Sequence, residues 1–349
     1  MSGSDYSEGA GEERPAAAGT EDGDLDQEAG AGALTIAARG AQGERVDRFL
    51  AKALAGKIEG VSRARIQRWI ALGAVSCGQR PLTASTRLSG FESLTVQPLP
   101  READRAFEPD PMELTVLDED EHLLVLDKPA GLVVHPAAGN WRGTLLNGLL
   151  HHRPALALLP RAGIVHRLDK DTSGLMVVAK SERAVASLVG QLSARTVSRR
   201  YFAFVAGRAP DRIEIDVPIG RDPRSRIRMA ALHTGPAKPA RTFVTRLAEL
   251  RVGETQASLV ECRLETGRTH QIRVHLKHIG HPLLGDALYG GPMSGIERQA
   301  LHAWRLGLQD PIDGRPRRWI SMPPADMQSL AQSGALDFRR ICDELDAAC

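Results

Sequence analysis

Residues 163–175 read GIVHRLDKDTSGL, and they place a dense polar loop between two apolar segments. We predict that a strand ends at Leu168, that residues 169–174 form a loop, and that a second strand follows. The last four residues of this loop, 171–174, are turn-forming residues, and a tight turn is enough to explain their presence. Asp169 differs, because it lies at a strand end between basic residues, where a carboxylate can project into a cleft and stay ionised. A buried ion pair explains the same composition, and the residues alone favour that alternative.

A second polar stretch, ETGRTHQIRVHL, covers residues 265–276. We predict a helix that Thr269 caps and Gly280 ends, with Ile272, Leu276 and Ile279 on its buried face. Arg273 lies beside this apolar stripe, so its charge is partly removed from water and needs a carboxylate partner. Asp169 is a partner that the chain itself offers.

Four histidines in and after this stretch raise the possibility of a zinc site. They are His270, His275, His278 and His281. Their spacing is not the HExxH pattern, and no CxxC pair accompanies them, so we favour packing and capping roles over metal binding. The chain also has no GxGxxG after a strand and no P-loop.

Strand-like and helix-like segments alternate over the rest of this region. Strands are predicted at residues 114–117, 123–126, 175–179, 201–206 and 257–264. Ser181 is the predicted cap of a helix that runs to residue 192. Its inward face is predicted to consist of Val185, Leu188, Val189 and Leu192. The pattern is typical of a mixed α/β or α+β sheet with helices packed on it.

The segment before this region, residues 34–98, is a small basic module. Between residues 43 and 98 there are nine bases and four acids. Apolar spacing predicts a helix over residues 46–54 and a second helix between Ser62 and Gly73, and short strands are predicted at 74–77 and 93–97. Arg63, Arg65 and Arg68 are predicted to face solvent and to form a phosphate-binding surface. An ordinary solvated helix face is the alternative.

The net charge of +2 over 349 residues conceals an asymmetry. Residues 1–33 contain nine acids and one base, a net of −8, so the remainder carries +10. We predict a disordered acidic tail over 1–33, a linker over 99–111 and a helical tail over 326–349. No run approaches the roughly 20 apolar residues of a membrane span. The four cysteines have no CxxC spacing, and the N-terminus has no secretory pattern, so we expect a cytoplasmic protein.

Four motifs carry a resemblance to a known family. In chain order they are DKPAGLVVHP (127–136), HRLDKDTSGL (166–175), RRY (199–201) and TGRTHQIRVH (266–275). Over residues 43–325 the chain resembles the RluA-type pseudouridine synthases, most of all their large-subunit ribosomal RNA D branch, and the basic module resembles an S4 RNA-binding domain. The resemblance implies an α+β pseudouridine synthase fold over residues 112–325, a mixed, largely antiparallel sheet with flanking helices. A small α/β S4 domain over 34–98 precedes it.

The resemblance also implies roles for individual residues. Asp169 matches the aspartate that attacks the target uridine, and the match fits addition either to the base or to the ribose. Tyr201 matches the tyrosine that stacks on the base and takes part in proton transfer, and Arg273 matches the basic partner of the aspartate. Ile272 matches an apolar residue beside the base, and Arg167 the arginine that fills the space left by the uridine. The isomerisation needs no cofactor and no metal.

The implied substrate is large-subunit ribosomal RNA, free or in an assembling subunit, and the expected state is a monomer. The same chemistry on transfer RNA or another RNA is one alternative. A catalytically silent RNA-binding factor in ribosome assembly is another, although the presence of Asp169, Tyr201 and Arg273 together argues against it.

Overall fold

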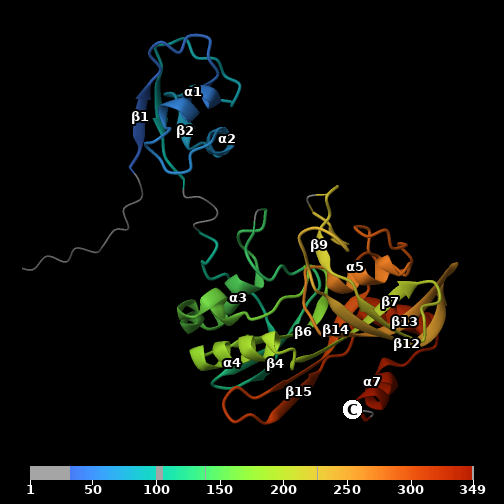
Figure 1. The fold of residues 1–349 in the computed structure, drawn as a ribbon. Coiled ribbons are helices and arrows are strands. Elements are labelled where there is room, and N and C mark those ends of the chain that lie inside the picture. The colour runs from blue at the N-terminus through green and yellow to red at the C-terminus, as the bar shows by residue number, and fades with distance from the viewer. Residues whose placement is uncertain (1–31, 100–104, 138, 226, 348–349) are drawn as a thin grey trace, which may run out of the picture. The chain divides into compact units, whose positions relative to one another are not determined.

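A computed structural model describes residues 32–99, 105–137, 139–225 and 227–347. Contacts divide the chain into two units, residues 1–100 and 101–349 (Figure 1). The predicted acidic tail, except for its last two residues, lies outside the described residues, as does part of the predicted linker. None of the described helices is both long enough and apolar enough to cross a membrane.

The first unit is a three-stranded antiparallel sheet with two helices. Its elements are β1 (Leu34–Ala37), α1 (Val46–Ala53), α2 (Arg63–Ala71), β2 (Val75–Ser76) and β3 (Ser93–Val96). Both predicted helices and both predicted strands are confirmed, and the Ser62 side chain caps α2 by accepting a hydrogen bond from the Arg65 amide. The strand β1 was not predicted. It has only two partly buried apolar side chains, and it exists because it pairs with β3 at the edge of the sheet.

The second unit is built on one large mixed sheet. Its strand order is β4-β5-β6-β14-β7-β13-β12-β8, with β15 paired to β14. The strands are β4 (Thr115–Glu119), β5 (Leu123–Lys128), β6 (Ser173–Ala179), β7 (Ser198–Ala206), β8 (Arg212–Asp216), β12 (Arg241–Val252), β13 (Thr255–Leu264), β14 (Leu301–Gln309) and β15 (Pro316–Ile320). Among the described pairs in this sheet, β6 and β14 are parallel and the others antiparallel. A smaller sheet joins β9 (Ile219–Arg221), β10 (Met229–Ala231) and β11 (Ala237–Lys238).

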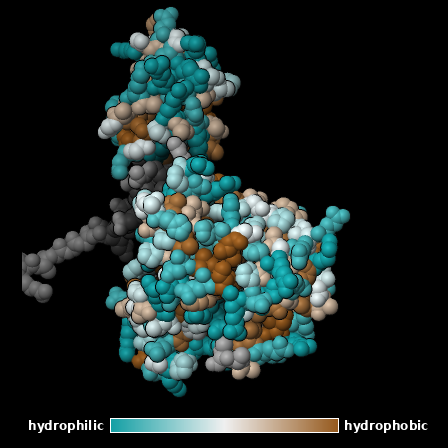
Figure 2. Space-filling view, turned by 45° about the vertical axis from the view of Figure 1, so that its right-hand side comes forward, coloured by the Kyte–Doolittle hydropathy of each residue, from teal (hydrophilic) through white to brown (hydrophobic). Residues whose placement is uncertain are grey.

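Helices cover both faces of the large sheet, which confirms the α+β class with a largely antiparallel sheet. The helical elements are α3 (Leu145–His152), η2 (Pro154–Leu158), η3 (Pro160–Gly163), α4 (Glu182–Ser193), α5 (Gln271–His278), α6 (Ala325–Ser333) and α7 (Phe338–Ala347). One face packs against α3, η2, η3 and α5, and the opposite face against α4, α6 and α7. Val189 of α4 is exposed, so its predicted place on the buried face is wrong, and Ala184 is buried there with Leu188. The surface in Figure 2 is mainly hydrophilic, with apolar side chains gathered in patches.

The segment before Asp169 is not the strand that the pattern predicts. The strand β5 pairs along one edge of β6, and β14 takes the start of the other edge, so Ile164 forms a single bridge to Val178. The His166 side chain accepts a hydrogen bond from the Val177 amide in place of a strand partner. Burial lowers the pKa of His166 to about 3, which keeps it neutral for that purpose.

The loop is also shorter than predicted, because Ser173 and Gly174 already belong to β6. Gly174 has a φ of +112°, and a Cβ there would lie 2.3 Å from the carbonyl oxygen of Ala303. A residue other than glycine would force β14 away from β6. The close approach of these two strands therefore fixes where the loop ends.

A buried histidine joins β6 to β14. The Ser173 Oγ and the His302 Nδ1 are 3.0 Å apart, and the His302 Nε2 lies 3.1 Å from the Ser321 carbonyl oxygen. Since the carbonyl only accepts, Nε2 carries the proton and Nδ1 accepts from the serine. Burial lowers the pKa of His302 to about 4.

This histidine makes the stability depend on pH. The unfolded histidine gains a proton below a pH of about 6.5, whereas the folded one gains it only near pH 4, so stability falls as the pH drops through this window. We expect wild type to lose roughly 2 kcal/mol more than His302→Gln between pH 7 and pH 5. Urea unfolding at both pH values measures the difference. The exposed His151→Gln should keep the wild-type dependence, and an equal dependence in His302→Gln would contradict the prediction.

Candidate active site

A cleft of about 880 Å³ opens on the face of the large sheet that carries α5. Its walls come from η3, the segment before β6, β7 and the first turn of α5. All five residues that the sequence predicts for the catalytic unit line it, and they are Arg167, Asp169, Tyr201, Ile272 and Arg273. The structure thus brings together residues that lie far apart in the chain.

The sheet explains how Asp169 and Tyr201 meet. Ala303 of β14 pairs with Gly174 on one side and with Tyr201 on the other. The strand β7 alternates its side chains between the two faces, so Tyr201 lies in the core cluster on the cleft side while Phe202 lies in the cluster on the opposite side. Asp169 precedes β6 by four residues and lines the same cleft as Tyr201.

Arg273 is held between two carboxylates. Its Nη1 donates to Oδ2 of Asp169 at 3.2 Å, while its Nε and Nη2 donate to both oxygens of Asp286 at 2.7 and 2.9 Å. The Asp286 side chain is 1% exposed and that of Arg273 7%, whereas that of Asp169 is 17% exposed. Burial lowers the pKa of Arg273, but the two carboxylates outweigh it and raise the pKa above its usual value. The arginine is therefore a fixed cation, and Asp169 is the carboxylate that a ligand can reach.

Asp286 is a residue of the site that was not predicted from the sequence. An available signal was its position, since it is the single charged residue in the apolar stretch 282–289. A lone acid in such a stretch is rarely buried without a partner.

His270 is a second group that points to Asp169. The Tyr289 hydroxyl accepts from the Met229 amide and lies 2.8 Å from Nδ1 of His270. The His270 Nε2 lies 4.0 Å from Oδ1 of Asp169. Burial lowers the pKa of His270 despite the nearby carboxylate, which favours the neutral ring.

The start of α5 differs from its prediction. The cap position is His270, in a left-handed conformation with φ +56°, and its side chain makes no capping bond. The predicted cap at Thr269 is therefore wrong. The Gln271 side chain instead accepts from the Arg268 amide and the Thr266 hydroxyl, which ties the helix to the preceding loop.

Tyr201 and Ile272 form the apolar floor of the cleft, and both are buried in its core cluster. Burial raises the pKa of Tyr201, and the charge of Asp169 adds to the rise. Its phenol therefore stays protonated at neutral pH. Arg167 is exposed and also lines the cleft.

Known proteins resemble this chain over most of its length. Residues 122–278 match the family described as RNA pseudouridylate synthase. A protein named ribosomal large subunit pseudouridine synthase D from Nitrosomonas europaea is 48% identical over 293 residues, which cover 81% of this chain and 83% of the relative. The chain belongs to the RNA pseudouridylate synthase family. A protein of the same name from Escherichia coli O157:H7 is 43% identical and covers 87% of this synthase and 94% of its own chain.

A solved structure agrees with the fold of the synthase. Human RNA pseudouridylate synthase domain containing 1 superposes with a TM-score of 0.53 at 26% identity. The match covers 68% of the synthase and 98% of the human chain. The family resemblance expected from the four motifs is thus confirmed, and the chain is an isomerase.

The four histidines considered for zinc occupy separate positions in the synthase. His275 bonds to the Thr242 hydroxyl and the Val217 carbonyl, and His281 to the Ala206 carbonyl. These bonds use both ring nitrogens of His275 and Nδ1 of His281, and the contact to Tyr289 uses Nδ1 of His270. No group of three or more metal-binding side chains occurs among the residues that the structure describes.

The three arginines predicted to contact RNA in the first unit differ in exposure. Arg63 and Arg68 are exposed, as predicted. Arg65 is half-buried, because it donates to the carbonyls of Glu59 and Leu99 and stacks over Trp69. The prediction that Arg65 faces solvent is therefore wrong, because these contacts hold its side chain against the fold.

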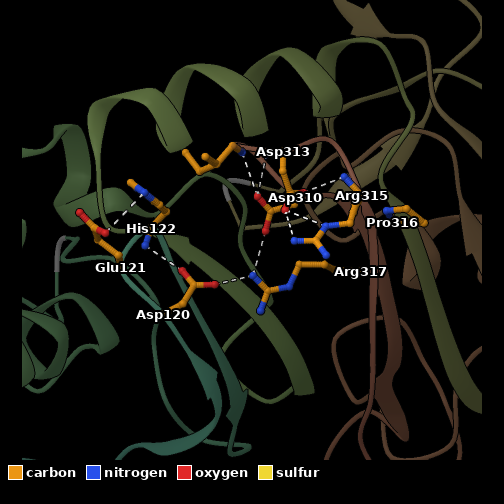
Figure 3. A pocket seen from close by; sticks show the side chains of 9 residues that line it. Asp120, Glu121, His122, Asp310, Asp313, Arg315, Pro316 and Arg317 are labelled. Carbon is orange, nitrogen blue, oxygen red and sulfur yellow. Dashed lines mark hydrogen bonds and ion pairs between the residues drawn. The ribbon is translucent and has the colours of Figure 1, made fainter.

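A second hollow of about 470 Å³ lies where the β4–β5 and β14–β15 turns meet (Figure 3). Arg317 donates to Asp118, Asp120 and Asp310 there. These charges satisfy one another and join the two turns. The hollow contains none of the predicted site residues.

Proposed function

We propose that this synthase isomerises uridines to pseudouridines in large-subunit ribosomal RNA, with Asp169 as the nucleophile. The observation that carries the proposal is the ion pair of Asp169 with Arg273 at the floor of an open cleft. The names of the relatives, which designate large-subunit enzymes, support the choice of substrate.

The geometry supports a carboxylate nucleophile. Arg273 donates to one oxygen of Asp169, and the His270 ring lies 4.0 Å from the other. The guanidinium therefore faces the negative charge that a nucleophilic carboxylate carries. Attack on the uridine joins Asp169 to the nucleotide and allows the glycosidic bond to break and the uracil to turn. C5 then bonds to the ribose carbon, and the bond to Asp169 breaks, which regenerates the carboxylate. The C5 proton must then leave, and the protonated Tyr201 phenol is suited to stack on the base and to relay a proton rather than to act as an ionised base.

A uridine must leave its stack before Asp169 can reach it, because the carboxylate lies within a cleft. Arg167 has a planar guanidinium and is exposed on the wall, so it can stack in the vacated position. Ile272 and Tyr201 offer an apolar floor for the flipped base.

The charge of the cleft suits a polyanion. Two acids, Asp169 and Glu265, line it together with six arginines. These arginines are Arg161, Arg167, Arg195, Arg199, Arg268 and Arg273. Such an excess favours binding to RNA phosphates.

Site-resolved pseudouridine mapping tests the proposal. Ribosomal RNA and transfer RNA are mapped from a deletion strain and from the same strain carrying the wild-type chain. We expect particular large-subunit uridines to lose modification in the deletion strain and to regain it with the wild-type chain. If modification is lost only in transfer RNA, then transfer RNA is the substrate in place of ribosomal RNA. An unchanged map would favour a catalytically silent assembly factor.

We also propose that the first unit, residues 34–98, is an S4-like RNA-binding domain, and that the enzyme works as a cytoplasmic monomer. The exposed Arg63 and Arg68 of α2 support the first proposal. One chain supplies every residue of the cleft, which supports the second.

Replacing Arg63, Arg65 and Arg68 together with Gln is expected to weaken RNA binding. For each RNA phosphate that the variant no longer binds, the slope of log K against log salt should fall by about 0.7–0.9, while the rate at saturating RNA stays unchanged. Filter binding at several salt concentrations and single-turnover kinetics measure the two effects, and thermal melting checks the support given by Arg65. The matched control replaces Arg208, Arg339 and Arg340, which are exposed and outside the cleft. Equal losses of affinity in both triple variants would contradict a specific role for α2.

A further inference from the structure

Three polar side chains that line the cleft form no hydrogen bond or ion pair within the part of the chain that the structure describes. They are those of His135, Arg161 and Arg167. The side chains of Arg161 and Arg167 are exposed and form no hydrogen bond or ion pair with the residues that the structure describes. The other arginines of the cleft include Arg195, which pairs with Glu265, and Arg268, which donates to a carbonyl.

His135 adds an unusual unsatisfied group. Its Nε2 is buried and has no hydrogen-bond partner among the described residues, although the ring lines the cleft. Burial lowers the pKa of His135, and the charges of Arg161 and Arg167 lower it further. The three side chains line the same cleft, close enough for the two charges to act on the imidazole, which is neutral at pH 7. A buried polar atom of this kind normally has a partner, which a ligand or a water molecule can supply.

Arg161 occupies a backbone conformation that L-residues rarely adopt. Its φ and ψ are 54° and 36°, and those of Ala162 are 51° and 37°. The turn ends at Gly163, whose backbone lies directly against β6, because a Cβ there would lie 1.9 Å from the carbonyl oxygen of Ala179. Strain of this type is found at functional sites, where the surroundings enforce it. The Arg161 guanidinium forms no ion pair with the described residues, so no such contact offsets the backbone strain. Its charge is therefore available to a ligand.

The position of Arg161 indicates which part of the RNA it meets. A flipped nucleotide turns about its own backbone, so its phosphate lies between the vacated stack and the pocket that receives the base. Arg167 is the proposed occupant of the stack, Asp169 lies in the base pocket, and Arg161 lines the same cleft, where its charge and that of Arg167 both act on His135. A guanidinium at this point can bind a phosphate oxygen with two N–H groups.

We propose that Arg161, with the neutral imidazole of His135 beside it, binds the RNA phosphate about which the target uridine turns out of its stack. The inference rests on the proposed function, since it needs an RNA substrate with a flipped uridine. The strained turn thus presents Arg161 to the RNA backbone, and this contact holds the RNA backbone while the base moves.

The test uses the full chain and an RNA stem–loop that contains a uridine found by the mapping. Single-turnover kinetics give the half-saturating protein concentration and the maximal rate, and a neutral methylphosphonate replaces one phosphate at a time around the uridine. For wild type we expect that a methylphosphonate at one linkage next to the uridine raises the half-saturating protein concentration several-fold. For Arg161→Gln we expect a several-fold higher half-saturating concentration, a salt slope reduced by about 1, and no further penalty at that linkage.

Two variants separate phosphate binding from backbone strain. Arg161→Gly relieves the strain, so its melting temperature should not fall below that of wild type, while its RNA affinity should fall as in Arg161→Gln. Arg195→Gln is the matched control, because Arg195 also has a positive φ of 61° and lines the cleft but is paired with Glu265. Arg195→Gln should respond to the methylphosphonate at that linkage as strongly as wild type does.

The outcomes distinguish the inference from the proposed function. A methylphosphonate penalty that persists in Arg161→Gln, or wild-type affinity in Arg161→Gly, would overturn the inference while RNA modification by the wild type still stands. A wild-type chain that modifies no uridine in the mapping would overturn both.

Discussion

Asp169→Asn is expected to abolish pseudouridine formation, with a rate at least about 10⁴-fold lower, as is typical when a covalent nucleophile is lost. The amide has the shape of the carboxylate but carries no negative charge, so it cannot attack the uridine. Arg273 keeps its two hydrogen bonds to Asp286, and the fold should therefore survive. RNA affinity should remain close to that of wild type, because phosphate contacts supply most of it.

Single-turnover conversion of an RNA fragment, filter binding and thermal melting measure these three quantities. Asp171→Asn is the matched control, since Asp171 lies in the same loop but does not line the cleft. It should retain nearly full activity. A folded Asp169→Asn enzyme with a rate within tenfold of wild type would show that another group is the nucleophile.

The sequence predicted those parts of the fold in which the apolar pattern is regular. The strands β5 and β6 are buried on both faces and read as continuous apolar runs, and α4 follows a clear cap at Ser181. The pairing of Arg273 with Asp169 was also predicted, because a partly buried arginine needs a carboxylate.

The features that were not predicted depend on contacts between segments without a periodic pattern. Lys128 is fully buried, and its Nζ donates to the carbonyls of Pro129, Leu132 and Lys170, which fixes the loop beside Asp169. Composition assigns a lysine to the surface, so nothing in the pattern suggested this role. The segment 164–168 looks like a strand, and only the occupied edges of β6 prevent it from becoming one.

Asp286→Asn is expected to destabilise the second unit by about 3–5 kcal/mol, because it leaves a buried arginine without its two-point carboxylate partner. The asparagine keeps the volume of the side chain, so the loss of stability arises from charge and hydrogen bonding and not from a cavity. Arg273 would keep its contact to Asp169 and at most one hydrogen bond to the asparagine oxygen. We expect the maximal rate of pseudouridine formation to fall about 10- to 100-fold, since the cation beside the nucleophile is no longer held in place.

The matched control is Asp326→Asn, which removes the charge from another two-point pair. Asp326 accepts from Nε and Nη2 of Arg298 at 2.6 and 2.9 Å, but its side chain is 39% exposed. Water can replace the lost partner there, so we expect a cost of only about 1 kcal/mol and an unchanged rate. Urea unfolding and single-turnover kinetics on both variants make the comparison. Equal losses of stability would mean that burial does not decide the strength of the Arg273–Asp286 pair, whereas a stability loss in Asp286→Asn without a loss of rate would mean that Asp169 needs no fixed cation beside it.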